Sequence, residues 1–234
     1  MAPDTRPEGE VRSRELAQGL APAALEEGSP GSRSFGSGAR ILSIGIAATG
    51  LFTFAYFSVA KHVLPDGPYG RIATLWAVLF VVMSVIYRPV EQLLSRTIAD
   101  RRARGAQAGH PLRVPALIQA SFALAFLVAA LVLRGPIQDG LFDGESSLYW
   151  ILVGAALAYA ASYFARGYFA GHQWFGLYGG LVLFESLSRF CFPVAVAVGI
   201  ASGETAVALG IAAAPLASLC VIPWALRRHE ASTT

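Results

Sequence analysis

The chain has 234 residues, of which 55% are hydrophobic and only 14% are charged. Because about a quarter of the residues in a soluble domain are charged, this composition excludes an ordinary soluble enzyme, a disordered chain and a fibrous repeat. The formal net charge of +3 is typical of a membrane protein with basic cytoplasmic loops, and it does not indicate binding of nucleic acid. We therefore expect an all-α membrane protein.

Long runs without charged residues predict six transmembrane helices. A hydrocarbon core about 30 Å thick needs about 20 helical residues. Four runs are long enough alone, a fifth spans the membrane if it continues through Arg88, and two short runs join through Glu185 and Arg189. The predicted helices are residues 41–62, 71–94, 113–134, 147–168, 175–201 and 204–226.

The ends of the chain differ from this core in composition. Residues 1–40 are rich in Pro, Gly, Ser and mixed charge, which predicts a disordered cytoplasmic N-terminal tail. A short surface helix over residues 13–25 is the less favoured alternative. Residues 41–226 form the six-helix transmembrane domain, and residues 227–234 form a cytoplasmic C-terminal tail.

The distribution of basic residues predicts the orientation of the helices. The loop at 135–145 is acidic and lacks Lys and Arg, as expected outside the cell, whereas Lys and Arg concentrate in cytoplasmic loops. With the N-terminus inside, the outer segments hold only Lys61, Arg71 and Arg134, and the inner segments hold Arg6, Arg12, Arg14, Arg33, Arg40, Arg96, Arg101, Arg102, Arg104, Arg113, Arg166, Arg227 and Arg228. We expect a multi-pass protein of the plasma membrane with both termini in the cytoplasm.

Glu185 and Arg189 are the most informative polar residues. They are four residues apart in the predicted fifth helix, so they share a face and can form an ion pair. Charges at this depth are costly and must face protein or water. Pro193, four residues later, deprives the Arg189 carbonyl of its helical donor. The pair is interpreted either as part of a transport path beside a kinked helix or as a buried salt bridge that locks the bundle.

A second polar cluster lies at the inner end of the second helix, in the sequence IYRPVEQLL, and includes Arg88, Glu91 and Gln92. Arg88 can reach the lipid headgroups and act as an anchor. Alternatively, it lines an inner vestibule that meets a phosphate-bearing substrate. Gln119, Tyr163, Arg166 and Tyr178 complete the candidate substrate path, which otherwise consists of Glu185, Arg189, Arg88 and Glu91.

Residues of other kinds are interpreted structurally. Cys191 and Cys220 are interpreted as small buried hydrophobic residues. Small residues four apart, Gly154 with Ala158 and Ala206 with Gly210 and Ala214, are expected to let helices approach closely.

Intramembrane hydrolysis lacks the residues it needs. The four histidines, His62, His110, His172 and His229, lie in predicted loops or at helix ends, whereas a metalloprotease or a serine protease needs histidine at helix depth. We therefore expect neither an enzyme nor a cofactor or metal site.

Three segments together are similar to a known family: LPDGPYGRIATLW, EQLLSRTIADRRARG and YFARGYFAGHQWFGLYGGLVLFESLSRF. Over about residues 41–226 the chain resembles the N-terminal half of polysaccharide-biosynthesis flippases in the multidrug/oligosaccharidyl-lipid/polysaccharide exporter superfamily. The resemblance implies one six-helix lobe of a MATE-like fold, which moves lipid-linked oligosaccharide to the outer leaflet. It also implies that Arg88 and Arg189 attract a pyrophosphate, and that Glu185 pairs with Arg189 or carries a coupling ion.

Family members have twelve or more spans, so the resemblance implies a second six-helix lobe or a parallel homodimer as partner, besides membrane lipids. Two other hypotheses remain open. One is a scaffold subunit of a polysaccharide-synthesis complex, with loop 95–113 contacting acidic lipid or a partner protein. The other is a drug or cation exporter of the same superfamily, for which Glu185 is the only clearly deep carboxylate.

Overall fold

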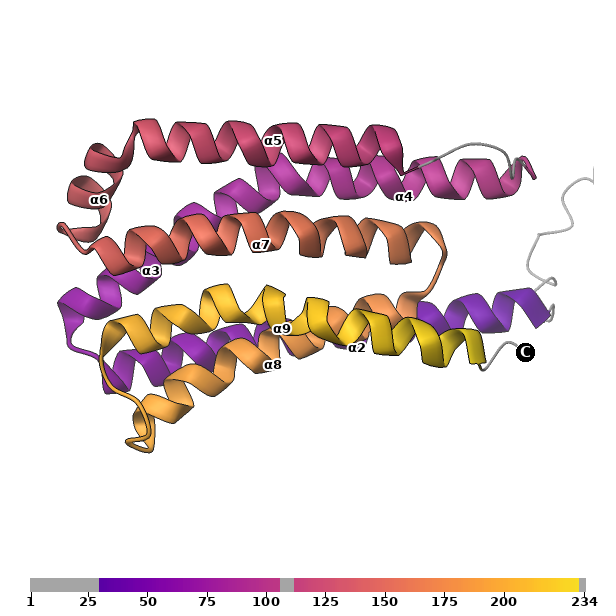
Figure 1. Cartoon of the computed structure of the whole chain (residues 1–234). Helices are drawn as coiled ribbons and strands as arrows, with labels where there is room; N and C mark the ends of the chain where they lie inside the picture. The colour runs from indigo at the N-terminus through magenta and orange to yellow at the C-terminus, as the bar shows by residue number, and fades with distance from the viewer. Residues whose placement is uncertain (1–29, 106–111, 232–234) are drawn as a thin grey trace, which may run out of the picture. The chain divides into compact units, whose positions relative to one another are not determined.

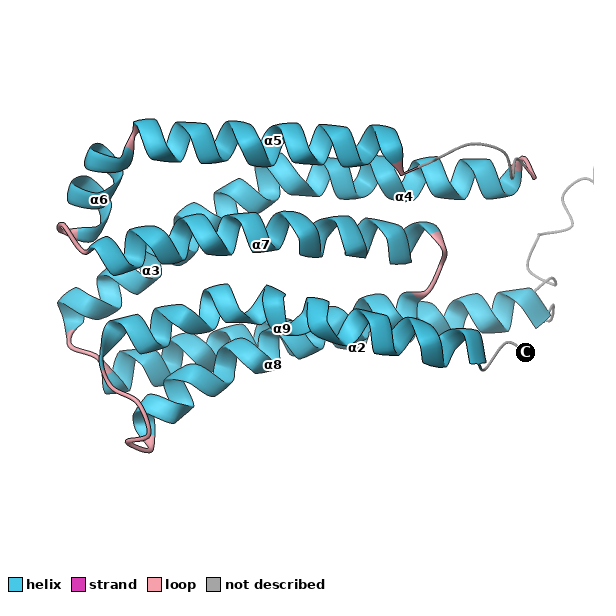
Figure 2. Ribbon diagram, viewed as in Figure 1, coloured by secondary structure: helices cyan, strands magenta, loops and turns pink. Residues whose placement is uncertain are grey.

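The computed structural model describes residues 30–105 and 112–231, with side chains described for 43–105 and 112–220. These residues form helices and short turns and no strand (Figures 1 and 2). The chain divides into two compact units, Met1–Gly38 and Ala39–Thr234, and the packing described below lies within the second. Within the described residues, six helices are long and apolar enough to cross a membrane, so the chain is an all-α, multi-pass membrane protein, as predicted.

The elements follow one another in this order: α2 (Pro30–Val63), α3 (Asp66–Val82), the π-helix η2 (Met83–Tyr87), α4 (Arg88–Ala103), α5 (Arg113–Val132), α6 (Arg134–Phe142), α7 (Ser146–Gly171), α8 (Phe175–Ala197) and α9 (Gly203–Ala231). Helix α2 thus begins at Pro30, within the segment assigned to the N-terminal tail. The rest of that tail, including the optional helix over residues 13–25, lies outside the described residues.

Helix α7 is the central helix of the second unit. It contacts α3, η2, α4, α5, α6, α8 and α9. In its most apolar stretch 61% of the residues are buried inside the protein, against 17% in α2 and in α5. The core around it contains Tyr149, Leu152 and Tyr159. The faces of α2 and α5 that point away from α7 carry exposed large apolar residues, such as Phe54 and Leu124, as expected for surfaces that contact lipid.

The second membrane helix contains a π-helical turn next to a proline. Pro89 has no N–H, and its ring would clash with the carbonyl four residues earlier in a regular α-helix. The preceding turn, Met83–Tyr87, widens, and the N–H of Arg88 donates to the carbonyl of Met83. The helix therefore continues unbroken over 38 residues, Asp66–Ala103. At 1.5 Å per residue it is about 57 Å long and exceeds the hydrocarbon core.

Close contact between α4 and α7 explains why the second helix is longer than the predicted 71–94. Leu94 and Ile98 of α4 are buried and lie against Gly167 and Gly171 of α7. A Cβ atom on Gly167 would lie 2.8 Å from the carbonyl oxygen of Glu91. A Cβ atom on Gly171 would lie 2.7 Å from the Cβ of Ile98. These two glycines, four residues apart, allow the kind of close approach that was predicted for other small residues.

Of the small residues chosen from the sequence, those of α9 fulfil the prediction and Gly154 does not. Gly210 faces α8, where a Cβ atom would lie 2.8 Å from the Cβ of Phe192, and Ala214 is fully buried. Gly154 is exposed, and a Cβ atom there would have no neighbour within 4 Å. The cysteine prediction was also wrong, because Cys191 and Cys220 are exposed.

A short helix, α6, occupies most of the segment 135–145, which was predicted as a loop. It ends in a turn with positive φ at Asp143 and Gly144, and the amide of Gln138 donates to the carbonyl of Gly144 at 2.8 Å. Phe142 is fully buried, which attaches α6 to the core. The predicted fifth helix was too long, since α8 ends at Ala197 and Gly199, with φ of 79°, turns the chain.

Candidate functional site

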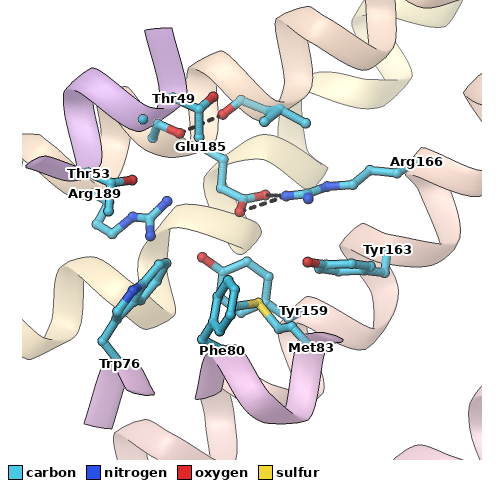
Figure 3. A pocket seen from close by; sticks show the side chains of 13 residues that line it. Thr49, Thr53, Trp76, Phe80, Met83, Tyr159, Tyr163, Arg166, Glu185 and Arg189 are labelled. Atoms are coloured by element: carbon cyan, nitrogen blue, oxygen red, sulfur yellow. Dashed lines mark hydrogen bonds and ion pairs between the residues drawn. The ribbon is translucent and has the colours of Figure 1, made fainter. Parts of the chain in front are cut away.

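A cavity of about 330 Å³ lies between α2, α3, η2, α7 and α8 (Figure 3). Hydroxyl groups, aromatic rings and charged groups line it, together with Gly50, Met83 and Val182. The aromatic lining includes Trp76, Phe80, Tyr159 and Tyr163, and the charged residues are Arg166, Glu185 and Arg189. A membrane-spanning unit that encloses charged groups in this way can hold a polar ligand within its bundle.

Glu185 forms its ion pair with Arg166 of α7 and not with Arg189. Nη2 of Arg166 lies 2.9 Å from Oε1 and 2.8 Å from Oε2 of Glu185, and the hydroxyl of Ser162 donates to Oε2 at 3.0 Å. The side chains of Arg166 and Glu185 are 10% and 3% exposed. Because Ser162 and Arg166 are four residues apart, one face of α7 supplies both donors. The predicted pairing of Glu185 with Arg189 was therefore wrong. Arg166, which was counted with an inner segment, lies buried within α7.

Arg189 is buried without a carboxylate partner in the described part of the chain. It is 3% exposed, and its guanidinium carbon lies 4.2 Å from the centre of the Trp76 ring. Its Nε and Nη1 atoms have no hydrogen-bond acceptor among the described residues. Figure 3 shows the guanidinium beside Trp76, with the Glu185 carboxylate between Arg189 and Arg166. An aromatic face stabilises a cation, but it leaves the N–H donors unsatisfied.

The charges around the cavity sum to one positive charge. Arg166 and Glu185 neutralise each other, and Arg189 remains. The Tyr163 ring adds a second cation–π contact, at 4.6 Å from the guanidinium carbon of Arg166. The hydroxyl of Thr49 donates to the carbonyl of Gly45 at 2.8 Å. The arrangement favours an anionic ligand over a cationic one.

Glu91 and Tyr178 form a separate contact nearer the end of the bundle that holds the α7–α8 turn. The hydroxyl of Tyr178 donates to Oε1 of Glu91 at 2.8 Å and connects α8 to α4. Glu91 also lies within electrostatic range of Arg166 and Arg88. Arg88 is exposed, and it makes no ion pair with any described residue. Basic and acidic residues thus alternate from Arg189 in the cavity through Glu185, Arg166 and Glu91 to Arg88, toward one end of the helices.

The eight residues predicted for a substrate path thus fall into three groups. Glu185, Arg189, Arg166 and Tyr163 line the cavity. Glu91 and Tyr178 bind each other beside it, with Arg88 on the surface. Gln119 lies apart, where its amide donates to the carbonyl of Ala160 at 2.8 Å and fixes α5 to α7.

The cavity lining also contains residues that were not predicted as part of the path, among them Trp76, Tyr159 and Ser186. Trp76 could have been noticed, because a tryptophan well inside a membrane helix is unusual when most lie at the interfaces. Tyr159 and Ser186 resemble ordinary core residues, and only the rotation of their helices brings them to the cavity.

A second set of ion pairs lies at the opposite end of the helices. Arg71 of α3 binds Glu204 of α9 through two hydrogen bonds of 3.0 and 2.8 Å, and Nη1 of Arg71 lies 3.2 Å from Oδ2 of Asp143. The Arg71 and Glu204 side chains are 19% and 13% exposed. These contacts hold the beginnings of α3 and α9 and the α6–α7 turn together.

No protein-family model, curated protein or solved structure matches this chain. Its fold and site define it as an all-helical, multi-pass membrane protein with a cavity whose lining carries a net positive charge.

Proposed function

We propose that the chain is one six-helix lobe of a transporter that moves lipid-linked oligosaccharide to the outer leaflet of the plasma membrane. The observation that carries the proposal is Arg189, a buried cation that faces a cavity and lacks an acceptor for two of its donors among the described residues. A cation in this position is costly unless an anion joins it. Phosphate oxygens match the donors of a guanidinium, so a pyrophosphate-linked lipid is a suitable ligand.

The size of the cavity suits the head of such a substrate. At about 330 Å³ it is near the lower limit of small-molecule sites. It can accommodate the pyrophosphate and adjacent atoms, while the lipid chain and the sugars extend beyond it. A second lobe would enclose the remainder, supplied by another chain, by a second copy or by further residues of the same polypeptide.

The distribution of charge supports the proposed orientation. Arg96, Arg101, Arg102 and Arg104 lie on or just after α4, and Arg113 begins α5. At the opposite end, Asp139, Asp143 and Glu145 lie on α6 or just after it. The positive-inside rule then assigns the α4–α5 connection and both termini to the cytoplasm.

The cavity favours a sugar-lipid transporter over the alternatives. A cation exporter needs an available deep carboxylate, but Glu185 already binds Arg166 and Ser162. The scaffold hypothesis does not explain why an arginine without a carboxylate partner lies beside a cavity. The MATE-like arrangement and a parallel partner lobe belong to the same proposal as the transport function.

The test compares two arginine variants of the full chain. Arg189→Gln should weaken binding of farnesyl pyrophosphate, a soluble isoprenoid pyrophosphate, by about tenfold to a hundredfold, because a charged hydrogen bond contributes about 1.5–3 kcal/mol. Arg96→Gln removes the same charge from an exposed site on α4 and should bind like the unchanged protein. Binding is measured by thermophoresis in lipid nanodiscs, with farnesol as the headgroup-free control.

Transport is measured in host cells as the amount of lipid-linked sugar accessible from outside. Arg189→Gln should reduce it, while the amount of protein inserted in the membrane stays the same. Equal binding and equal transport by the two variants would refute the proposed role of Arg189.

A further inference from the structure

Glu185 lies between two arginines, Arg166 and Arg189, and its carboxylate can pair with either one. Arg166 belongs to α7 and is its observed partner. Arg189 is four residues further along α8, and a glutamate on the N-terminal side of an arginine at this spacing is the favoured arrangement for a pair within one helix. Glu185 can therefore pair with Arg189 by side-chain rotation alone, without movement of the α8 backbone.

The two pairings have different consequences for the bundle. The Glu185–Arg166 pair and the Ser162 hydrogen bond connect α8 to α7. A Glu185–Arg189 pair would lie within α8 and connect it to nothing else. α8 packs more extensively on α9 than on α7. The α7–α8 interface contains an apolar cluster of Phe169, Leu181 and Val182 and, beside it, the polar contacts of Glu185.

The aromatic partner of Arg189 makes the exchange possible. Arg189 rests on the Trp76 ring, with two donors unsatisfied within the described residues. No carboxylate or carbonyl of that part of the chain holds these donors, so any anion that enters the cavity competes with Glu185 for the same guanidinium. The hydroxyl of Tyr159 lies within electrostatic range of all three charged groups.

We propose that Glu185 is an internal competitor for Arg189 and exchanges between Arg166 and Arg189 as the cavity releases or takes up its anion. A bound anion occupies Arg189, keeps Glu185 on Arg166 and so holds α8 against α7. Loss of the anion frees Arg189 to draw Glu185 away from α7. Glu185 is thus a positioning residue that couples occupancy of the site to a helix contact. This inference rests on the proposed function, because it requires an anion at Arg189.

The experiment observes the Trp76 ring directly. The full chain, which contains four tryptophans, is labelled with 5-fluorotryptophan in nanodiscs and studied by ¹⁹F NMR. The Trp76 signal is assigned by its loss in Trp76→Phe. Arg189→Gln gives the reference position for a ring without its cation, and farnesyl pyrophosphate is the probe anion.

If Glu185 exchanges between the two arginines, the probe should keep Arg189 on the Trp76 ring. The Trp76 signal of the unchanged protein should then move further from its position in Arg189→Gln. Glu185→Gln should occupy that shifted position without probe, because the competitor is gone. The ratio of molecules with Arg189 on the Trp76 ring to molecules with Arg189 paired to Glu185 should change by at least about twofold. An exposed ion pair at this spacing contributes a factor of this size. By reciprocity, Glu185→Gln should bind the probe at least about twofold more tightly.

A second variant controls for a loss of the native fold in Glu185→Gln. Glu185→Gln leaves Arg166 buried without its partner, so the double variant Arg166→Gln/Glu185→Gln, which lacks both charges, is measured beside it with the same expected Trp76 position. If both variants have the Trp76 signal of the unchanged protein while Arg189→Gln has lost the probe, the exchange is refuted and the anion site stands. If Arg189→Gln binds the probe as well as the unchanged protein does, the proposed function fails as well.

Discussion

The contact between α4 and α7 at Gly167 gives the sharpest test of the packing. In the variant Gly167→Ala the new methyl group would lie 2.8 Å from the carbonyl oxygen and 3.1 Å from the Cα atom of Glu91. Both are backbone atoms, so no side chain can turn aside to relieve the overlap. The two helices must therefore separate by several tenths of an ångström along this contact.

The cost of that separation can be estimated from the structure. Overpacking by one methyl group in a tight interior costs about 1–3 kcal/mol. Part of this is offset because alanine favours a helix over glycine by up to about 1 kcal/mol. Gly154→Ala on the same helix is the matched control, since nothing lies within 4 Å of its methyl position. It should leave the free energy of unfolding unchanged or raise it.

Thermal unfolding is followed by circular dichroism in the same detergent for both variants. Gly167→Ala should unfold at a temperature several degrees lower, since 1 kcal/mol corresponds to about 2–4 °C for a chain of this size. Equal melting temperatures for Gly167→Ala and Gly154→Ala would refute the close approach of α4 and α7.

Two further substitutions probe the polar contacts at either end of the helices. Glu204→Gln should lower the free energy of unfolding by about 1–2 kcal/mol, because Arg71 loses both hydrogen bonds to this carboxylate. Asp66→Asn is the control and should have a much smaller effect, since its ion pair is exposed to solvent. Equal unfolding curves of the two variants in denaturant would contradict this. Tyr178→Phe removes the donor to Glu91 and should lower the free energy of unfolding by about 1–2 kcal/mol. The amides near the start of α8 should then exchange hydrogen faster. An unchanged exchange pattern there would disprove the contact.

The number of membrane helices could be predicted from sequence because it depends on one physical requirement. A segment that crosses the hydrocarbon core must be apolar over about 20 residues, and this requirement is visible in the residue order. The lengths of the helices were harder to predict. α4 continues well past its apolar part because Leu94 and Ile98 meet glycines of α7, a contact between segments far apart in the chain that no local pattern contains.

The candidate site was predicted in residue type and only partly in geometry. A buried glutamate and arginine in one helix were recognised from their cost in lipid. Their partners depend on how α7 is rotated, and that rotation follows from the fit of Gly167 and Gly171 against α4. Arg166 looks like the end of a span in the sequence. It instead lies inside a 26-residue helix that continues to Gly171, facing Glu185.

The backbone at Arg189 packs closely on α9, while its side chain reaches the cavity, and this combination suits a binding residue. Pro193 cannot donate to the Arg189 carbonyl. That carbonyl faces Gly210 of α9, where a Cβ atom would lie only 2.9 Å from the oxygen. α9 thus approaches closely and fixes the position of the α8 turn, while the guanidinium lies against the Trp76 ring and the cavity. A site with a closely packed backbone and an unsatisfied donor group is preorganised for its ligand.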